Sequence, residues 1–354
     1  MSRFFSATHA ALDPYTPGEQ PKDQQYIKLN TNESPFPPSP LAQRYAAEAA
    51  ACVQLYSDPE CTLLREKIAA LYGVEPEEVL PTNGSDEILN FAFMAFGDET
   101  HPAVFPDITY GFYPVFAQLN HIPYRAIPLK DDYTIDPADY AGHKGLVVIA
   151  NPNAPTGIAL ELDVIESIVA ANPDAVVVID EAYVDFGGQT AIPLIRKYDN
   201  LLVTQTFSKS RSLAGARLGF GVGCKALIRD LNTIKYATNP YNVNRITMAA
   251  GVGSLEDEAY TQNNCQTIIE NREWTAQELA KLGYECLPSK TNFLFVKHPK
   301  LNGQATYQHL RESGILVRHF AKPRLDDFNR ITIGTMDQMR AVVAALAKEA
   351  EAVK

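Results

Sequence analysis

The chain has 354 residues, of which 46% are hydrophobic and 21% charged, and this composition indicates a soluble globular protein large enough for two domains. A net charge of −11 and the scarcity of basic clusters argue against nucleic acid or an anionic membrane as partners. No apolar run approaches the ~18 residues of a membrane span, and the N-terminus lacks the long apolar core of a signal peptide. We therefore expect a cytoplasmic protein.

The five cysteines are an odd number, are widely spaced and form no C-x-x-C pair. Neither a disulfide framework nor a metal site is expected from them.

The first part of the chain predicts an extended arm followed by a large α/β domain. Residues 1–40 contain many prolines between 13 and 40 and few periodic apolar positions, which is typical of an extended segment. Helical patterns follow at 41–55, 60–72 and 85–96. Four short runs, apolar on nearly every position, lie at 103–105, 145–150, 175–180 and 201–203. Such runs indicate strands buried on both faces, as in a mainly parallel sheet covered by helices.

The last third of the chain predicts a smaller α+β domain. A break at 236–244 precedes a long helical pattern over about 255–282. Further strands are expected at 292–296 and 331–333, and further helices at 303–313 and 336–351. The predicted division is therefore an arm at 1–40, a large domain at 41–245, and a small domain at 246–354 that includes part of the arm.

Lys209 is the leading candidate for covalent chemistry. It follows the apolar strand in a small polar turn, with Thr206 and Ser208 beside it and Arg217 further along the same segment. Hydroxyls and a guanidinium bind phosphate well, and a lysine amine forms a Schiff base with an aldehyde. This combination suits a phosphorylated aldehyde cofactor, whereas a lone S-K pair would favour a solvated lysine.

Other polar residues fall where strands of a parallel sheet end, which is where active groups gather. Asp180 ends the strand 175–180, with Tyr183 three residues later, and a buried carboxylate there could pair with a protonated pyridine nitrogen. A structural Asp that caps the next element is about equally compatible with Asp180 alone.

Three further segments have a binding and a structural interpretation. Gly84, Ser85 and Asp86 open an apolar helix, whose free N–H groups suit a phosphate but could simply be capped by Ser85. The rigid N-P-N-A-P-T-G turn at 151–157 favours a binding loop over an ordinary connection. Tyr110 could stack on a planar ring, although such aromatics are more often core residues. The glycine-rich run 219–223 lacks dinucleotide-loop spacing and predicts a strand.

Taken together, these segments resemble the fold-type-I aminotransferases that use pyridoxal 5′-phosphate, and most of all the histidinol-phosphate aminotransferases. The matching motifs run in family order from about residue 12 to 335. They are L-N-T-N-E-S-P at 29–35, Y-S-D-P from Tyr56, G-S-D-E at 84–87, N-P-N-A-P-T-G at 151–157, D-E-A-Y-V-D-F from Asp180, S-K-S-R-S-L-A-G-A-R-L-G-F at 208–220, K-T-N-F at 290–293, V-R at 317–318 and R-I-T-I-G-T at 330–335.

The resemblance implies a large domain with a mainly parallel seven-stranded sheet, a smaller α+β domain, and a homodimer with shared active sites. Lys209 would carry the cofactor and act as general base and acid, Asp180 would hold the pyridine N–H, and Tyr183 would hydrogen-bond the phenolic oxygen. Gly84, Ser85, Asp86, Thr206, Ser208 and Arg217 would surround the phosphate. Tyr110 would stack on the ring, Tyr56 would reach the neighbouring subunit's cofactor, and Tyr15, Arg318 and Arg330 would bind the substrate's anionic groups.

One residue departs from the family pattern. The family has Asn directly before Pro-Thr-Gly, where its amide contacts the phenolic oxygen, and this chain has Ala154 there. Asn153 is the alternative candidate for that contact, and Tyr183 acting alone is the other. One lost hydrogen bond costs on the order of 1 kcal/mol, which is too little to abolish activity.

The resemblance favours transamination of histidinol phosphate with 2-oxoglutarate by a ping-pong route in histidine biosynthesis. An aromatic-amino-acid aminotransferase and a phospho-amino-acid decarboxylase remain open on the same scaffold. A non-catalytic binding protein of this fold is disfavoured because Lys209, Asp180 and Arg330 are all present.

Overall fold

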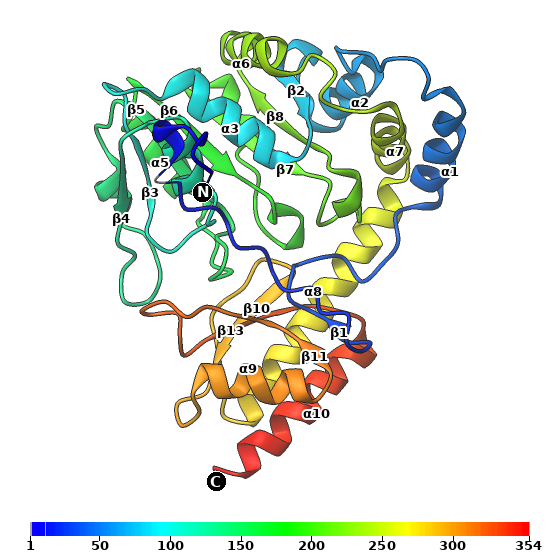
Figure 1. Ribbon diagram of the computed structural model, residues 1–354, viewed down its shortest axis with the longest axis vertical. Helices are drawn as coiled ribbons and strands as arrows, with labels where there is room; N and C mark the ends of the chain where they lie inside the picture. Colours follow the sequence, from blue (N-terminus) through cyan, green and yellow to red (C-terminus); the bar gives the residue numbers. More distant parts are fainter. Residues whose placement is uncertain (1, 11, 354) are drawn as a thin grey trace.

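The computed structural model describes residues 2–10 and 12–353, which form one large sheet with its helices and a second, smaller group of strands and helices (Figure 1). The long helix α8 (Glu258–Lys281) runs between the two groups in this view.

The large sheet has seven strands in the order β2-β8-β7-β6-β5-β3-β4. Strand β8 pairs antiparallel with both of its neighbours, β2 and β7, and the other pairings are parallel, so the predicted, mainly parallel seven-stranded sheet is confirmed. The strands are β2 (Val79–Thr82), β3 (Ala103–Pro106), β4 (Tyr124–Ile127), β5 (Gly145–Ala150), β6 (Ala175–Asp180), β7 (Leu201–Thr206) and β8 (Gly219–Gly223).

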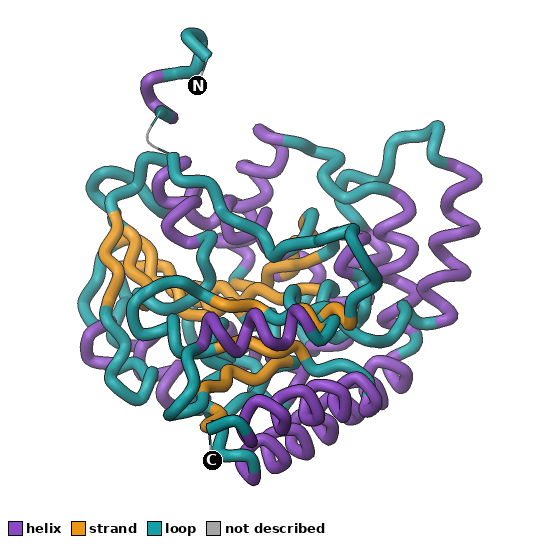
Figure 2. Tube along the Cα trace, turned by 60° about the horizontal axis from the view of Figure 1, so that its bottom comes forward, coloured by secondary structure: helices purple, strands orange, loops and turns teal. Residues whose placement is uncertain are grey.

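Helices cover both faces of this sheet, which explains the uninterrupted apolar runs (Figure 2). Alternate side chains of β5 enter different cores: Val147 and Ile149 join one cluster, and Leu146 and Val148 join the other. The helices of this part are α1 (Pro40–Ala49), α2 (Thr62–Tyr72), α3 (Ser85–Phe96), α4 (Tyr113–Leu119), α5 (Leu162–Ala170), α6 (Lys225–Thr238) and α7 (Arg245–Glu256).

The smaller group contains a four-stranded antiparallel sheet in the order β12-β13-β10-β9 and a parallel pair, β1-β11. Its strands are β1 (Ile27–Lys28), β9 (Glu285–Cys286), β10 (Phe293–Lys297), β11 (Ile315–Leu316), β12 (Arg318–His319) and β13 (Asn329–Thr332). Helices α8, α9 (Gly303–Glu312) and α10 (Met336–Glu351) pack with it. Its core also takes Leu29 from the arm and Phe186 from the segment between β6 and β7.

Helix α7 was not predicted from the sequence. It contains Gly251 and Gly253, which are poor helix formers, but both are needed for close packing. A Cβ on Gly253 would lie 2.6 Å from the carbonyl oxygen of Leu41 in α1. Tertiary packing therefore overrides the local preference here.

Short 3-10 helices connect the longer elements: η1 (Ala7–His9), η2 (Ala50–Cys52), η3 (Pro76–Glu78), η4 (Pro137–Tyr140), η5 (Val184–Phe186), η6 (Ile192–Arg196) and η7 (Ala214–Ala216). Within residues 2–10 and 12–353, every helix is too short or too polar to cross a lipid bilayer.

Candidate active site

A cavity of about 340 Å³ opens at the carboxyl edge of the large sheet. Strand register explains its position, because Ala150 at the end of β5 pairs with Asp180 at the end of β6, which pairs with Thr204 in β7. The loops that follow these strands therefore converge. The lining residues are Thr31, Glu33, Ser85, Asp86, Tyr110, Ala150, Pro152, Ala154, Asp180, Ala182, Tyr183, Thr206, Ser208, Lys209, Ala214, Gly215 and Arg217.

Lys209 lies half-buried in the turn that follows β7 and reaches into this cavity. Its Nζ donates to the carbonyl oxygen of Thr31 at 3.4 Å and lies 5.7 Å from the ring centroid of Tyr183. Among the described residues no carboxylate lies within 4.0 Å of this Nζ. The amine is thus held by the arm and is free of an ion pair.

Asp180 also lines this cavity and is buried, with an exposed fraction of 4%. Tyr113 Oη donates to its Oδ2 at 2.8 Å, and the Ala182 N–H donates to its Oδ1 at 3.2 Å. Burial raises the pKa of Asp180 to about 6, and the two hydrogen bonds oppose that rise. A cationic N–H placed against this carboxylate would stabilise its ionised form.

Arg217 and Asp86 form the polar end of the cavity. Arg217 Nη2 lies 2.9 Å from Asp86 Oδ2, and Tyr110 Oη donates to Asp86 Oδ1 at 2.7 Å. Arg217 Nη1 also donates to Ser208 Oγ at 3.5 Å. Asp86 therefore holds the guanidinium over the cavity.

The first turn of α3 lies at the same end. Gly84 is its N-cap, with φ of 81°, and a Cβ at that position would lie 2.6 Å from Arg217 Nη2. Gly84 does not itself line the cavity, but it allows Arg217 to lie against the helix start. The N–H groups of a first helical turn have no partner within the helix, so this end suits a phosphate.

Tyr183 is fixed by a residue of the arm. Its Oη accepts a hydrogen bond from Asn32 Nδ2 at 2.9 Å. Asn32 is buried and also bonds Thr332 through its backbone N–H and its side-chain oxygen, at 3.0 and 3.1 Å. The arm therefore links Tyr183 to the small sheet.

Two arginines face each other on that small sheet. Arg318 in β12 is the register partner of Arg330 in β13. Arg318 donates to the carbonyl oxygens of Thr16 and Pro17, and Arg330 Nη2 donates to that of Asn30 at 3.1 Å. Like charges directly opposite on paired strands repel. In the described part of the chain neither guanidinium has a carboxylate within ion-pair distance.

The surroundings of Arg330 also favour the binding of an anion. Its Nε is buried without a hydrogen-bond partner, and burial together with the charge of Arg318 lowers the pKa of Arg330. Tyr15 from the arm lies nearby, stacked on Phe112 with ring centroids 4.4 Å apart, and contributes to the field at Arg330. The arrangement is suited to an anion.

Comparison with known proteins agrees with this geometry. Residues 24–346 match the family "Aminotransferase class I and II". The chain is 49% identical to "Histidinol-phosphate aminotransferase 2" of Dechloromonas aromatica (strain RCB), over 98% of this chain and 99% of the relative. It is also 49% identical to "Histidinol-phosphate aminotransferase 1" of Bordetella parapertussis, with the same coverage.

This chain belongs to the class I and II aminotransferases, in the histidinol-phosphate aminotransferase family. The fold agrees with that membership. A crystal structure of histidinol-phosphate aminotransferase from Sinorhizobium meliloti in complex with pyridoxal-5′-phosphate has a TM-score of 0.86 at 23% identity, covering 100% of this chain and 99% of that one.

Asn153 is not among the residues that line the cavity. Its Nδ2 donates to the Ile108 carbonyl oxygen and to Thr156 Oγ1, and its Oδ1 accepts from Thr109 Oγ1. The amide thus braces neighbouring loops, and the methyl group of Ala154 lines the cavity instead. The geometry gives no support to Asn153 as a cofactor contact.

Tyr56 is also not among the residues that line the cavity of its own chain. It is 79% exposed and stacks on Tyr241 with centroids 4.5 Å apart. Val53, Leu55 and Leu63 are exposed nearby in the sequence.

Sequence reasoning missed two residues that hold the site. Tyr110 was predicted as a site residue and Tyr113 was not, although a tyrosine at the start of a helix after a strand is a local clue. Asn32 was used only as part of a family motif. Both act through buried hydrogen bonds between segments far apart in the sequence, which local patterns do not reveal.

Proposed function

We propose that this chain transfers an amino group from histidinol phosphate to 2-oxoglutarate by a ping-pong route, yielding imidazole-acetol phosphate and glutamate. Membership of the aminotransferase family and the relatives named histidinol-phosphate aminotransferase support this reaction. A planar guanidinium binds phosphate and carboxylate with the same pair of hydrogen bonds, so one pocket can serve both substrates in turn.

The observation that carries the choice of donor is the facing pair Arg318 and Arg330. Two cations opposite each other, with no ion-pair partner among residues 2–10 and 12–353, suit a dianionic phosphate better than the aromatic ring of phenylalanine. Tyr15 would add an aromatic face and a hydroxyl beside this pair.

Pyridoxal 5′-phosphate is the cofactor of this family, and the cavity has groups for each part of it. Asp180 would hold the ring N–H, Tyr183 would donate to the phenolic oxygen, and Tyr110 would lie against the ring. Ser85, Asp86, Thr206, Ser208 and Arg217 would surround the phosphate, with Gly84 permitting the close approach. When bound, the cofactor supplies an electron sink that makes the hydrogen on the donor's α-carbon acidic.

Lys209 would carry the cofactor and then move the proton. Its Nζ lies among the lining groups without an ion pair, so the amine is available both as a nucleophile and as the base that accepts the α-carbon proton. The carbonyl oxygen of Thr31 would orient Nζ between these roles.

We also propose a homodimer with shared sites, in which the exposed Tyr56 reaches the cofactor phosphate of the partner subunit. The division into an arm at 1–40, a large domain at 41–245 and a small domain at 246–354 with part of the arm is proposed alongside. The parallel pairing of β1 with β11 supports the assignment of part of the arm to the small domain.

The test of the function is a panel of amino donors. Purified protein loaded with pyridoxal phosphate is mixed with histidinol phosphate, phenylalanine or O-phosphothreonine, and the cofactor absorbance and carbon dioxide release are followed. Two charge-assisted hydrogen bonds to the phosphate predict a preference for histidinol phosphate over phenylalanine of about 100-fold or more in kcat/KM. A higher kcat/KM for phenylalanine would identify an aromatic aminotransferase, and carbon dioxide from phosphothreonine a decarboxylase.

A further inference from the structure

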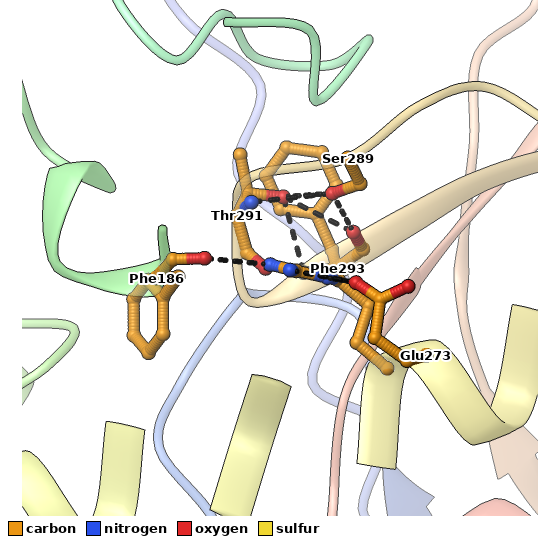
Figure 3. A network of polar contacts seen from close by, with 6 residues as sticks. Phe186, Glu273, Ser289, Thr291 and Phe293 are labelled. Carbon is orange, nitrogen blue, oxygen red and sulfur yellow. Dashed lines mark hydrogen bonds and ion pairs between the residues drawn. The ribbon is translucent and has the colours of Figure 1, made fainter. Parts of the chain in front are cut away.

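Arg272 is a buried cation in the middle of α8, with 2% of its side chain exposed. Its Nη1 donates to the carbonyl oxygens of Phe186 and Thr291, both at 2.8 Å. Its Nε and Nη2 donate to Glu273 Oε1 at 3.2 and 2.9 Å. Figure 3 shows Phe186 on one side of this network and Glu273 on the other, with Thr291 above them.

The two carbonyls belong to segments that are far apart in the sequence. Phe186 ends η5, which follows Tyr183, and its N–H donates to the Tyr183 carbonyl oxygen at 3.1 Å. Thr291 lies in the turn that leads into β10, whose first residue is Phe293. One guanidinium nitrogen therefore holds together the segment after β6 and the turn before β10.

The turn before β10 is itself rigid. Ser289 Oγ and Thr291 Oγ1 both donate to the Phe293 carbonyl oxygen, at 2.7 and 3.0 Å, and lie 2.9 Å from each other (Figure 3). A shift of the Thr291 carbonyl would consequently move Phe293 with it.

The rings of Tyr183 and Phe293, which belong to the two segments held by Arg272, each lie near one positive group of the proposed reaction. They meet edge to face, with centroids 5.2 Å apart at 89°. Lys209 Nζ lies 5.7 Å from the Tyr183 centroid, and Arg330 Cζ lies 5.3 Å from the Phe293 centroid. Each ring thus connects Arg272 to one of the two positive groups of the proposed reaction.

A buried guanidinium is a costly way to join two backbone segments, because the charge is removed from water. Its only carboxylate partner in the described residues, Glu273, is 60% exposed and compensates weakly. A planar fork is, however, well suited to fixing two carbonyls at a defined separation.

We propose that Arg272 is a positioning residue, which fixes Tyr183 and Phe293 through the carbonyls of Phe186 and Thr291 and so sets the places of Lys209 and Arg330. The roles of Lys209 and Arg330 rest on the function proposed above, whereas the link through Arg272 between the two backbone segments rests on the geometry alone.

The experiment compares Arg272→Met, Arg272→Lys and Glu273→Gln in the full-length protein loaded with pyridoxal phosphate. Misplacing reacting groups by about 1 Å lowers rates by about 100-fold, so we expect kcat/KM of Arg272→Met to fall by about that factor, with raised KM for both substrates. Arg272→Lys keeps the charge but not the forked guanidinium, so its kcat/KM should lie between those of the wild type and Arg272→Met. Glu273→Gln leaves both carbonyl bonds intact and should stay within about two-fold of the wild type.

A second readout needs no substrate. Donation from Tyr183 to the phenolic oxygen favours the ionised form of the bound cofactor, so its loss should raise the pH midpoint of the cofactor absorbance by about 0.5–1 pH unit. Fluorescence of Trp274, the chain's single tryptophan, monitors folding of each variant without cofactor.

If Arg272 is merely structural, its replacement should lower only the fraction of folded protein. Unchanged KM values and an unchanged pH midpoint of the cofactor absorbance would therefore overturn the proposal. If Arg272→Met does not fold, the same two measurements on Arg272→Lys decide. If histidinol phosphate is not a donor, the proposed function fails, while the midpoint comparison still tests the positioning role.

Discussion

Replacing Arg330 should impair catalysis without lowering the stability of the protein. Nη2 of this residue is bonded to the Asn30 carbonyl oxygen, and Nε is buried without a partner. A substrate carboxylate or phosphate would accept two charge-assisted hydrogen bonds here, each contributing about 1.5–3 kcal/mol. Arg330→Met removes both, so kcat/KM should fall by about 10²- to 10⁴-fold in both half-reactions.

The stability of the protein without cofactor or substrate should move the other way or not at all. Arg330 faces the like charge of Arg318 and has no acid partner within the described residues, so methionine relieves a repulsion and a desolvated charge. We expect the free energy of unfolding to stay constant or to rise by about 1 kcal/mol.

The assay is urea unfolding of the apoprotein beside single-turnover kinetics with histidinol phosphate and, separately, with glutamate. Arg318→Met is the matched control, since its guanidinium holds the arm through Thr16 and Pro17 and should matter mainly for the phosphate-bearing donor. A clear loss of stability in Arg330→Met with unchanged kinetics would show that Arg330 is structural and refute the reasoning.

Three further predictions concern the cavity. Tyr113→Phe removes the buried donor to Asp180 and should lower kcat by about 10-fold or more, since hydrogen bonds to charged groups contribute about 1.5–3 kcal/mol; unchanged kcat would contradict this. The pKa of Asp180 is raised from 3.8 to about 6, so its contribution to apoprotein stability is fully present below pH ~4 and is lost as the pH rises through about 6. Measured by thermal unfolding, the Asp180→Asn variant should therefore lose less stability than the wild type between pH 4 and 7. Parallel plots of stability against pH for the two proteins would rule this out. Mixed dimers of Lys209→Ala and Tyr56→Ala subunits should regain one intact site of two, whereas no recovery over the parent mixtures would exclude a shared site.

The sheet and the main polar residues could be predicted because each depends on local sequence. Strands buried on both faces carry apolar residues at every position, as in β5 and β6, and this pattern is visible without the fold. Asp180 ends one such strand and Lys209 lies in the turn after another, so the rule that active groups gather at carboxyl ends placed them in one cavity.

The missed features depend on contacts between distant segments. Asn32 reaches Tyr183 across 151 positions, and Tyr113 reaches Asp180 across 67, and nothing in either local sequence indicates the partner. Asn153 was one of two alternatives for the missing Asn at position 154, because it directly precedes Ala154, but its amide donates to the Ile108 carbonyl oxygen and to Thr156. Sequence position alone does not indicate which way a side chain in such a turn is used.

The smaller core is assembled from three separate parts of the chain, and this has a consequence for synthesis on the ribosome. Ile27 pairs with Ile315, and Leu29 enters a cluster whose other buried members, apart from Phe186, run from Cys265 to Ala350. The beginning of the polypeptide must therefore wait for nearly all of the rest to be translated before it finds its neighbours. Until then β1 lacks its partner strand, and a nascent chain halted before residue 315 does not contain the β11 residues that pair with it.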